Sequence, residues 1–99
     1  MTSETTVTFV CEYQIHRVSI AIRWQRCGQN YVGTVPWIKN EQAFLLRWDE
    51  DHGKYQVSSC LTAETHFLSE TNDAMHCALL VLREHVSGFF RYLAEGGVR

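Results

Sequence analysis

Cysteine and histidine are the residue types in this sequence best suited to catalysis, and they are spread along the whole chain. Four cysteines stand at positions 11, 27, 60 and 77, and there are five histidines. A nucleophilic Cys–His pair needs the thiol and the imidazole within hydrogen-bond reach of each other. On a helix the neighbours His76 and Cys77 point about 100° apart, and Cys77 and His85 are separated by two turns, roughly 12 Å. Cys60 or His66 can meet either group only through the fold.

Sequence motifs typical of enzymes and metalloproteins do not occur. The chain contains no GxSxG, no HExxH and no glycine-rich phosphate loop. Its cysteines include no CxxC, and the closely spaced ligand pairs of a zinc site are missing. We therefore expect a protein that is not an enzyme and that needs no metal and no cofactor. A cysteine enzyme ranks third among the functions considered.

Three consecutive carboxylates, Asp49, Glu50 and Asp51, precede His52 and Gly53. Carboxylate oxygens can hold calcium, but the stretch lacks the glycine and the distal glutamate of an EF-hand loop. Gly53 suits a hairpin closed by a bulge. The stretch is thus predicted to be an acidic hairpin tip, and such a negative protrusion can dock into a basic groove on a partner.

Arginines mark a second candidate surface. Arg17 and Arg23 fall on the polar side of one predicted strand, and Arg47 on the polar side of another. If those two strands are neighbours, the guanidinium groups share a face suited to an anionic or nucleotide ligand, or to single-stranded RNA. The aromatics of these strands fall on the apolar side: Phe9, Trp24, Phe44 and Trp48. The alternative is a solvated face on which Glu12 pairs with an arginine.

Length and composition indicate one soluble domain. The chain has 99 residues, 45% of them hydrophobic, and a net charge of −2 without any run of Lys or Arg. Duplex nucleic acid is therefore not an expected partner. The polar N-terminus is unlike a secretory signal, and no apolar run approaches the roughly 18 residues of a membrane span. We expect a cytoplasmic protein with reduced thiols and no membrane contact; two disulfides are the alternative for a secreted chain.

Alternation of apolar and polar residues predicts five strands, at residues 7–15, 17–25, 31–35, 43–48 and 55–61. The phase slips near His16, which favours either a tight turn or a bulge there. Gly28 and Asn30 tolerate positive φ and predict a hairpin turn. Pro36 is expected to end the third strand. Residues 62 to 70 read as a polar connection.

A single helix is predicted over residues 72–95, with Thr71 or Asn72 as N-cap and Gly96-Gly97 at the C-terminal end. One stripe should face the core: Met75, Leu79, Leu82, Val86, Phe89, Phe90 and Leu93. A second apolar row runs beside it: Ala74, Cys77, Val81, His85, Gly88 and Tyr92. Together the rows span roughly 200°, and a helix packed on one sheet needs a little over 100°.

Something besides the sheet should therefore cover the second row. Either a partner protein binds there, most simply a second copy in a homodimer, or residues 62 to 70 of the same chain cover it. The candidate partner-binding residues are Cys77, Val81, His85, Gly88 and Tyr92, together with Asp49, Glu50 and Asp51 of the acidic tip. His85 itself is expected to be a packed, hydrogen-bonded imidazole rather than a pH switch.

The predicted fold is α+β: an antiparallel sheet of about five strands with one long C-terminal helix packed on one face. The expected function is that of a small non-enzymatic protein–protein interaction domain, which binds and inhibits or adapts a larger partner. Small inhibitors that phages direct against host defence complexes are an analogy for such a domain. The alternative is a binder of a small anionic or nucleotide ligand at Arg17, Arg23 and Arg47.

Overall fold

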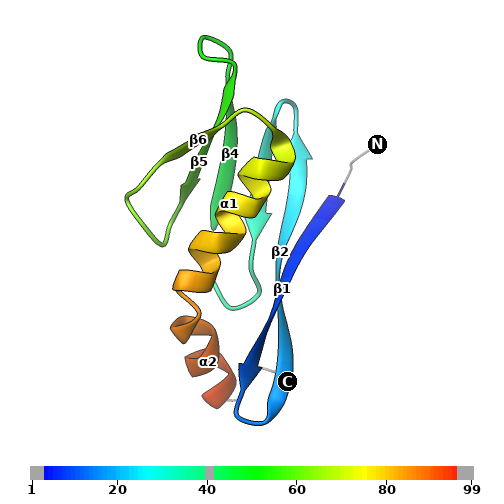
Figure 1. The fold of residues 1–99 in the computed structure, drawn as a ribbon, viewed down its shortest axis with the longest axis vertical. Coiled ribbons are helices and arrows are strands. Elements are labelled where there is room, and N and C mark those ends of the chain that lie inside the picture. Colours follow the sequence, from blue (N-terminus) through cyan, green and yellow to red (C-terminus); the bar gives the residue numbers. More distant parts are fainter. Residues whose placement is uncertain (1–3, 40–41, 96–99) are drawn as a thin grey trace.

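The computed structural model describes residues 4–39 and 42–95, which form a curled antiparallel sheet with two helices (Figure 1). The elements are β1 (Glu4–Tyr13), β2 (His16–Cys27), β3 (Asn30–Thr34), β4 (Phe44–Asp49), β5 (Lys54–Ser59), β6 (His66–Leu68), α1 (Thr71–Glu84) and α2 (Ser87–Ala94). The strands lie in chain order, β1-β2-β3-β4-β5-β6. The predicted α+β class with an antiparallel sheet is confirmed. The described residues have six strands rather than five, and two helices rather than one.

The β1–β2 hairpin closes through a two-residue turn at Gln14 and Ile15, where Gln14 has a φ of 58°. Of the two alternatives near residue 16, the turn is therefore the one observed. Phe9 pairs with Ile20 across the two strands, so the apolar rows of both strands share the inner face. The first strand was predicted to extend to residue 15, and that end is wrong, because β1 ends at Tyr13 and Ile15 lies in the turn. The Ile15 side chain is 92% exposed at the turn.

The other turns agree with the glycine pattern. Gly28 and Gly53 have φ values of 66° and 61°, and each lies in the hairpin predicted for it. Asn30 does not need positive φ. It begins β3, and its side-chain oxygen accepts a hydrogen bond from the Trp48 backbone N–H at 3.0 Å. Pro36 follows the end of β3, as predicted.

The centre of the core lies where β2, β3 and β4 pair through Trp24, Gly33 and Phe44. Gly33 has no side chain, so the rings of Trp24 and Phe44 approach across it, with centroids 6.2 Å apart. A Cβ atom at Gly33 would lie 2.8 Å from Trp24, 2.9 Å from Ile22 and 3.0 Å from the Phe44 Cβ. The absence of a side chain at residue 33 thus permits the ring packing on which the core is built.

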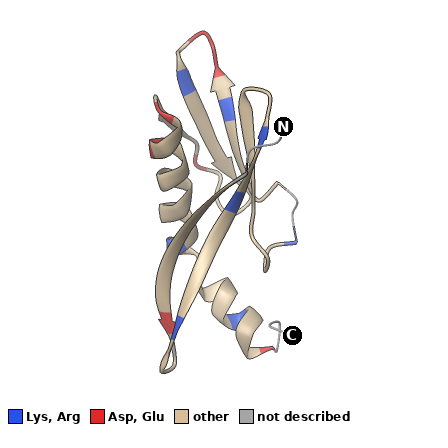
Figure 2. Ribbon diagram, turned by 90° about the vertical axis from the view of Figure 1, so that its right-hand side faces the viewer, with Lys and Arg blue, Asp and Glu red and all other residues tan. Residues whose placement is uncertain are grey.

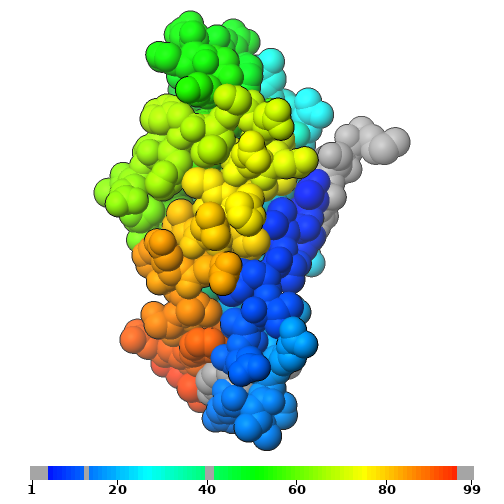
Figure 3. Space-filling model, viewed as in Figure 1, coloured from blue at the N-terminus to red at the C-terminus, as the bar shows by residue number. Residues whose placement is uncertain are grey.

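Helix α1 lies in the hollow of the curled sheet and contacts both edge strands, β1 and β6, as well as β4 and β5. Figure 3 shows β1 along one flank of the helix and the β5–β6 segment along the other. The helix buries one face: Ala74, Met75, Ala78, Leu79, Val81 and Leu82. On the β1 side, the Arg83 guanidinium lies 5.6 Å from the centre of the Phe9 ring. Met75, Leu79 and Leu82 of the predicted core stripe are buried, as expected. Ala74 and Val81 were assigned to the second row, and they are buried as well, so the core face is wider than predicted.

The helix breaks at His85 and Val86, so the single helix predicted over 72–95 is wrong. The Nδ1–H of His85 donates to the Val81 carbonyl at 2.9 Å, and the His85 backbone N–H donates to Leu82 instead. The imidazole therefore takes the acceptor that a continuous helix would give to the His85 backbone. Ser87 and Gly88 follow, and both are weaker helix formers than alanine.

The start of α1 also differs from the prediction. The N-cap residue is Glu70 rather than Thr71 or Asn72, and it makes no side-chain capping bond. The predicted C-terminal Gly96-Gly97 lies outside the described residues. Neither helix in the described part of the chain is long and apolar enough to cross a membrane.

Candidate functional site

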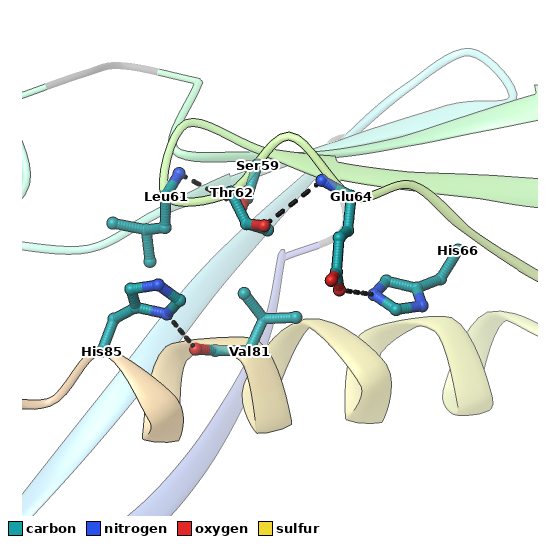
Figure 4. A network of polar contacts seen from close by, with 7 residues as sticks. All are labelled: Ser59, Leu61, Thr62, Glu64, His66, Val81 and His85. Carbon is teal, nitrogen blue, oxygen red and sulfur yellow. Dashed lines mark hydrogen bonds and ion pairs between the residues drawn. The ribbon is translucent and has the colours of Figure 1, made fainter.

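A groove of about 610 Å³ lies between α1 and the segment that leads through β6. It is lined by Thr62, Glu64, His66, Leu68, Asp73, His76, Cys77, Leu80, Val81, Glu84 and His85. Figure 4 shows residues of the two walls facing each other, with Glu64 and His66 opposite the helix that carries Val81 and His85. Three residues of the predicted second row, Cys77, Val81 and His85, thus line this groove.

Side-chain hydrogen bonds shape the wall formed by residues 60–66. The Leu61 N–H donates to the Ser59 hydroxyl, and the Glu64 N–H donates to the Thr62 hydroxyl, each at 3.2 Å. Such local bonds from serine and threonine stabilise turns. His66 then pairs with Val57 of β5, which ties the end of the segment to the sheet. The wall is therefore a structured connection, although the sequence indicated only a polar passage.

The opposite wall is one face of α1, on which lining residues recur three or four positions apart from Asp73 to His85. At 1.5 Å per residue this face is about 18 Å long. Its apolar members are Cys77, Leu80 and Val81. Leu80 is 44% exposed, one of few large apolar side chains so exposed in the described residues. The middle of the helical wall thus offers apolar surface to a ligand, mainly from Leu80.

The charged residues that line the groove are acidic. Glu64, Asp73 and Glu84 line it, and no Lys or Arg occurs among its described lining residues. The Glu64 carboxylate lies 3.8 Å from Nε2 of His66, an ion pair when that imidazole is protonated. With its histidines neutral, the groove carries three negative charges and no positive one. A ligand that complements it should carry positive charge.

The chemistry of Cys77 does not favour nucleophilic catalysis. Burial raises the pKa of the Cys77 thiol above its usual value, so the reactive thiolate is disfavoured at neutral pH. Burial raises the pKa of Cys11 in the same way. No hydrogen bond between Cys77 and a histidine is present in the described residues. The His85 imidazole is instead half-buried and bonded to Val81.

The acidic tip lies at the β4–β5 turn, at the end of the molecule drawn uppermost in Figure 2. Asp49 organises it by accepting bonds from the Asp51 N–H at 3.1 Å and from Nδ1 of His52 at 2.7 Å. The hydrogen bond from His52 lowers the pKa of the Asp49 carboxyl. Within residues 4–39 and 42–95, no three His, Cys, Asp or Glu side chains are grouped to hold a metal ion. The tip and the groove are separate surfaces.

The arginines are not brought together in the way that an anion site requires. The strand order places β3 between β2 and β4, so the strands of Arg23 and Arg47 are not neighbours. Arg17 lies near the β1–β2 turn, directly across from Glu12. Figure 2 shows the Lys and Arg positions spread along the length of the molecule. The geometry on which the anionic-ligand hypothesis depends is therefore not met.

The last two residues of the second row do not line the groove. A Cβ atom at Gly88 would lie 2.9 Å from the Trp37 ring, so residues of the same chain already occupy the space beside Gly88. Trp37 also packs against Phe89, with ring centroids 5.8 Å apart. Tyr92 is half-buried in α2. Trp37 thus explains the small residue at position 88 without a second chain.

The fold brings His66 to the same groove as Cys77 and His85, which the sequence had left open. Sequence reasoning did not propose the other lining residues as a site: Thr62, Glu64, Leu68, Asp73, His76, Leu80 and Glu84. The helical members share the spacing of Cys77 and Val81, so a wider arc around those two residues would have included them. The residues of the other wall carry no such signal, because their position depends on the pairing of β6 with β5.

Comparison of the chain with models of protein families, with curated proteins and with solved structures found no match. The geometry of the groove is therefore the basis on which a function is proposed.

Proposed function

We propose that this protein is a small non-enzymatic interaction domain that binds a larger partner protein through the groove between α1 and residues 62–68. The observation that carries the proposal is the groove itself, an open depression of about 610 Å³ lined by both apolar and polar side chains. Exposed apolar surface framed by polar residues is typical of binding sites. Leu80, at 44% exposure, supplies the apolar surface that a partner would bury.

The chemistry of the site supports binding over catalysis. The raised pKa of Cys77 disfavours a thiolate, and Nδ1 of His85 is engaged by a backbone carbonyl. General acid–base or nucleophilic catalysis needs a nucleophile and a base within reach of each other. Inhibition or adaptation of the partner, and a cytoplasmic location, remain predictions from the sequence.

A homodimer through the second helix row also remains a prediction. The argument for a dimer contact is weaker at Gly88, because the Trp37 ring already explains why a small residue is needed there. The half-buried groove residues Cys77 and His85 keep their place as candidate contacts, whereas Val81 is buried in the core and offers little surface. The acidic tip at Asp49 is a separate candidate surface for the same or another partner.

Affinity capture with paired variants tests the proposal. Leu80→Lys removes apolar surface from the groove and adds a charge, and Val10→Lys makes the same change at a 51% exposed position on β1, away from the groove. Cell extract is passed over the wild type and over both variants, and bound proteins are quantified by mass spectrometry. We expect one protein to be retained by the wild type and by Val10→Lys and depleted at least about tenfold with Leu80→Lys, a loss of about 1.4 kcal/mol.

Equal retention by all three proteins would contradict the proposal, since the contact would then lie outside the groove. Circular dichroism of each variant provides the control for folding. Both substitutions are at exposed sites, where the free energy of unfolding should change by no more than about 0.5 kcal/mol.

A further inference from the structure

We infer that the partner enters the groove with an extended, basic segment, so that a stretched chain carrying Lys or Arg lies between α1 and β6. This inference rests on the proposed function and specifies the occupant of the site. It has three supports: the charge of the lining, the length of the groove and the position of β6 at the edge of the sheet.

Charge selects a basic occupant. Glu64 stands on one wall and Asp73 and Glu84 on the other, so carboxylates flank a ligand from both sides. The described lining residues include no cation apart from protonatable histidines: His66, His76 and His85. An acidic segment would meet like charges along the whole length, whereas lysine or arginine would find a carboxylate on either side.

The length of the groove sets the length of an extended occupant. The helical wall from Asp73 to His85 is about 18 Å long. An extended chain, which rises about 3.3 Å per residue, would place about five or six residues along it.

The edge of the sheet supplies a further reason for an extended conformation. In the described part of the chain, β6 pairs with β5 on one side and is the last strand of the sheet. An edge strand has backbone N–H and C=O groups available to an added strand, which is how many extended peptides are recognised. His66 and Leu68 of this strand line the groove, so a segment lying there is next to β6.

Isothermal titration with synthetic peptides tests the inference. The probe is a capped peptide of about six residues that alternates lysine and valine, and its counterpart carries glutamate in place of lysine. Three carboxylates, each contributing as an exposed ion pair, should favour the lysine peptide by about tenfold or more in Kd. The preference should weaken as salt is raised, because salt screens exposed charges.

Matched variants locate the effect. The double variant Glu64→Gln and Glu84→Gln keeps the size of both side chains and removes two charges from opposite walls, so it should lose most of the preference. Asp51→Asn removes a charge from the acidic tip and should retain it. Equal affinity for the two peptides, or the same loss with Asp51→Asn, would overturn the inference.

Two further measurements test whether the groove recognises an extended peptide rather than positive charge alone or a helical peptide. If spermine binds as tightly as the lysine peptide, the groove recognises charge alone and the extended segment is refuted. If a helical basic peptide binds more tightly than the extended one, the extended conformation of the occupant is refuted. The proposed function is tested separately by the capture experiment. If Leu80→Lys abolishes capture of a partner, the proposed function stands even when the peptide titrations refute the extended basic segment.

Discussion

Replacing Phe44 by alanine is expected to lower the free energy of unfolding by about 3–5 kcal/mol. The Phe44 side chain is fully buried, contacts Trp24 and fills the space beside Gly33 at the centre of the sheet. Its removal leaves a cavity that the neighbouring strands cannot close without changing their pairing. A domain of this size has a total stability of about 5–15 kcal/mol, so the variant should unfold at a much lower urea concentration.

Phe67→Ala is the matched control for that experiment. Phe67 lies on β6 and is 53% exposed, so the same substitution removes little buried surface there. Urea denaturation followed by tryptophan fluorescence should show a change well below that of Phe44→Ala. Similar losses for both variants would mean that the centre of the core has been misassigned.

The second large effect is expected at Gly33, where any side chain overfills the core. Gly33→Ala should cost about 1–3 kcal/mol and Gly33→Val more, because overpacking forces neighbours from their positions. The nearest atoms to an added Cβ come from both flanking strands, including the Cβ of Phe44 at 3.0 Å, which cannot move without its backbone. Urea denaturation should give a lower free energy of unfolding for Gly33→Ala than for the wild type, and a still lower one for Gly33→Val.

Ser19→Val tests whether a valine in a strand is by itself enough to cause the loss of stability expected for Gly33→Val. Ser19 is exposed on the outer face of β2, where valine suits a strand and meets no core atom, so a change within about 0.5 kcal/mol is expected. If Gly33→Val proves as stable as the wild type, the close approach of Trp24 and Phe44 across residue 33 is not a constraint.

The strands could be predicted because their apolar residues alternate over long stretches, as in the rows of Phe9 and Ile20. The change of phase in the apolar pattern near residue 16 corresponds to the turn at Gln14 and Ile15. The strand β6 could not be predicted, since three residues within a polar segment carry too little pattern. The helix break was also hidden, because it depends on the bond from the His85 side chain to Val81, whereas the apolar spacing continues through it.

The candidate site was predictable on one wall only. Helical spacing brought Cys77, Val81 and His85 together, and each lines the groove. The sequence left open whether a partner or residues 62 to 70 would cover this row. The structure places residues 62–68 across from the row with an open groove between them, so the coverage is partial. That outcome depends on how β6 pairs, a long-range contact that local periodicity does not encode.

Site-specific photo-crosslinking in the cells that naturally contain the protein tests the groove as the partner site most directly. A benzophenone side chain is introduced at Leu80 in the groove, at Phe67 on the outer face of β6, or at Asp51 in the acidic tip. Illumination is followed by mass spectrometry of the adducts. The groove predicts a reproducible adduct with one partner protein from position 80 and little or none from position 67. An adduct from position 67 or 51 with none from position 80 would show that the partner binds elsewhere.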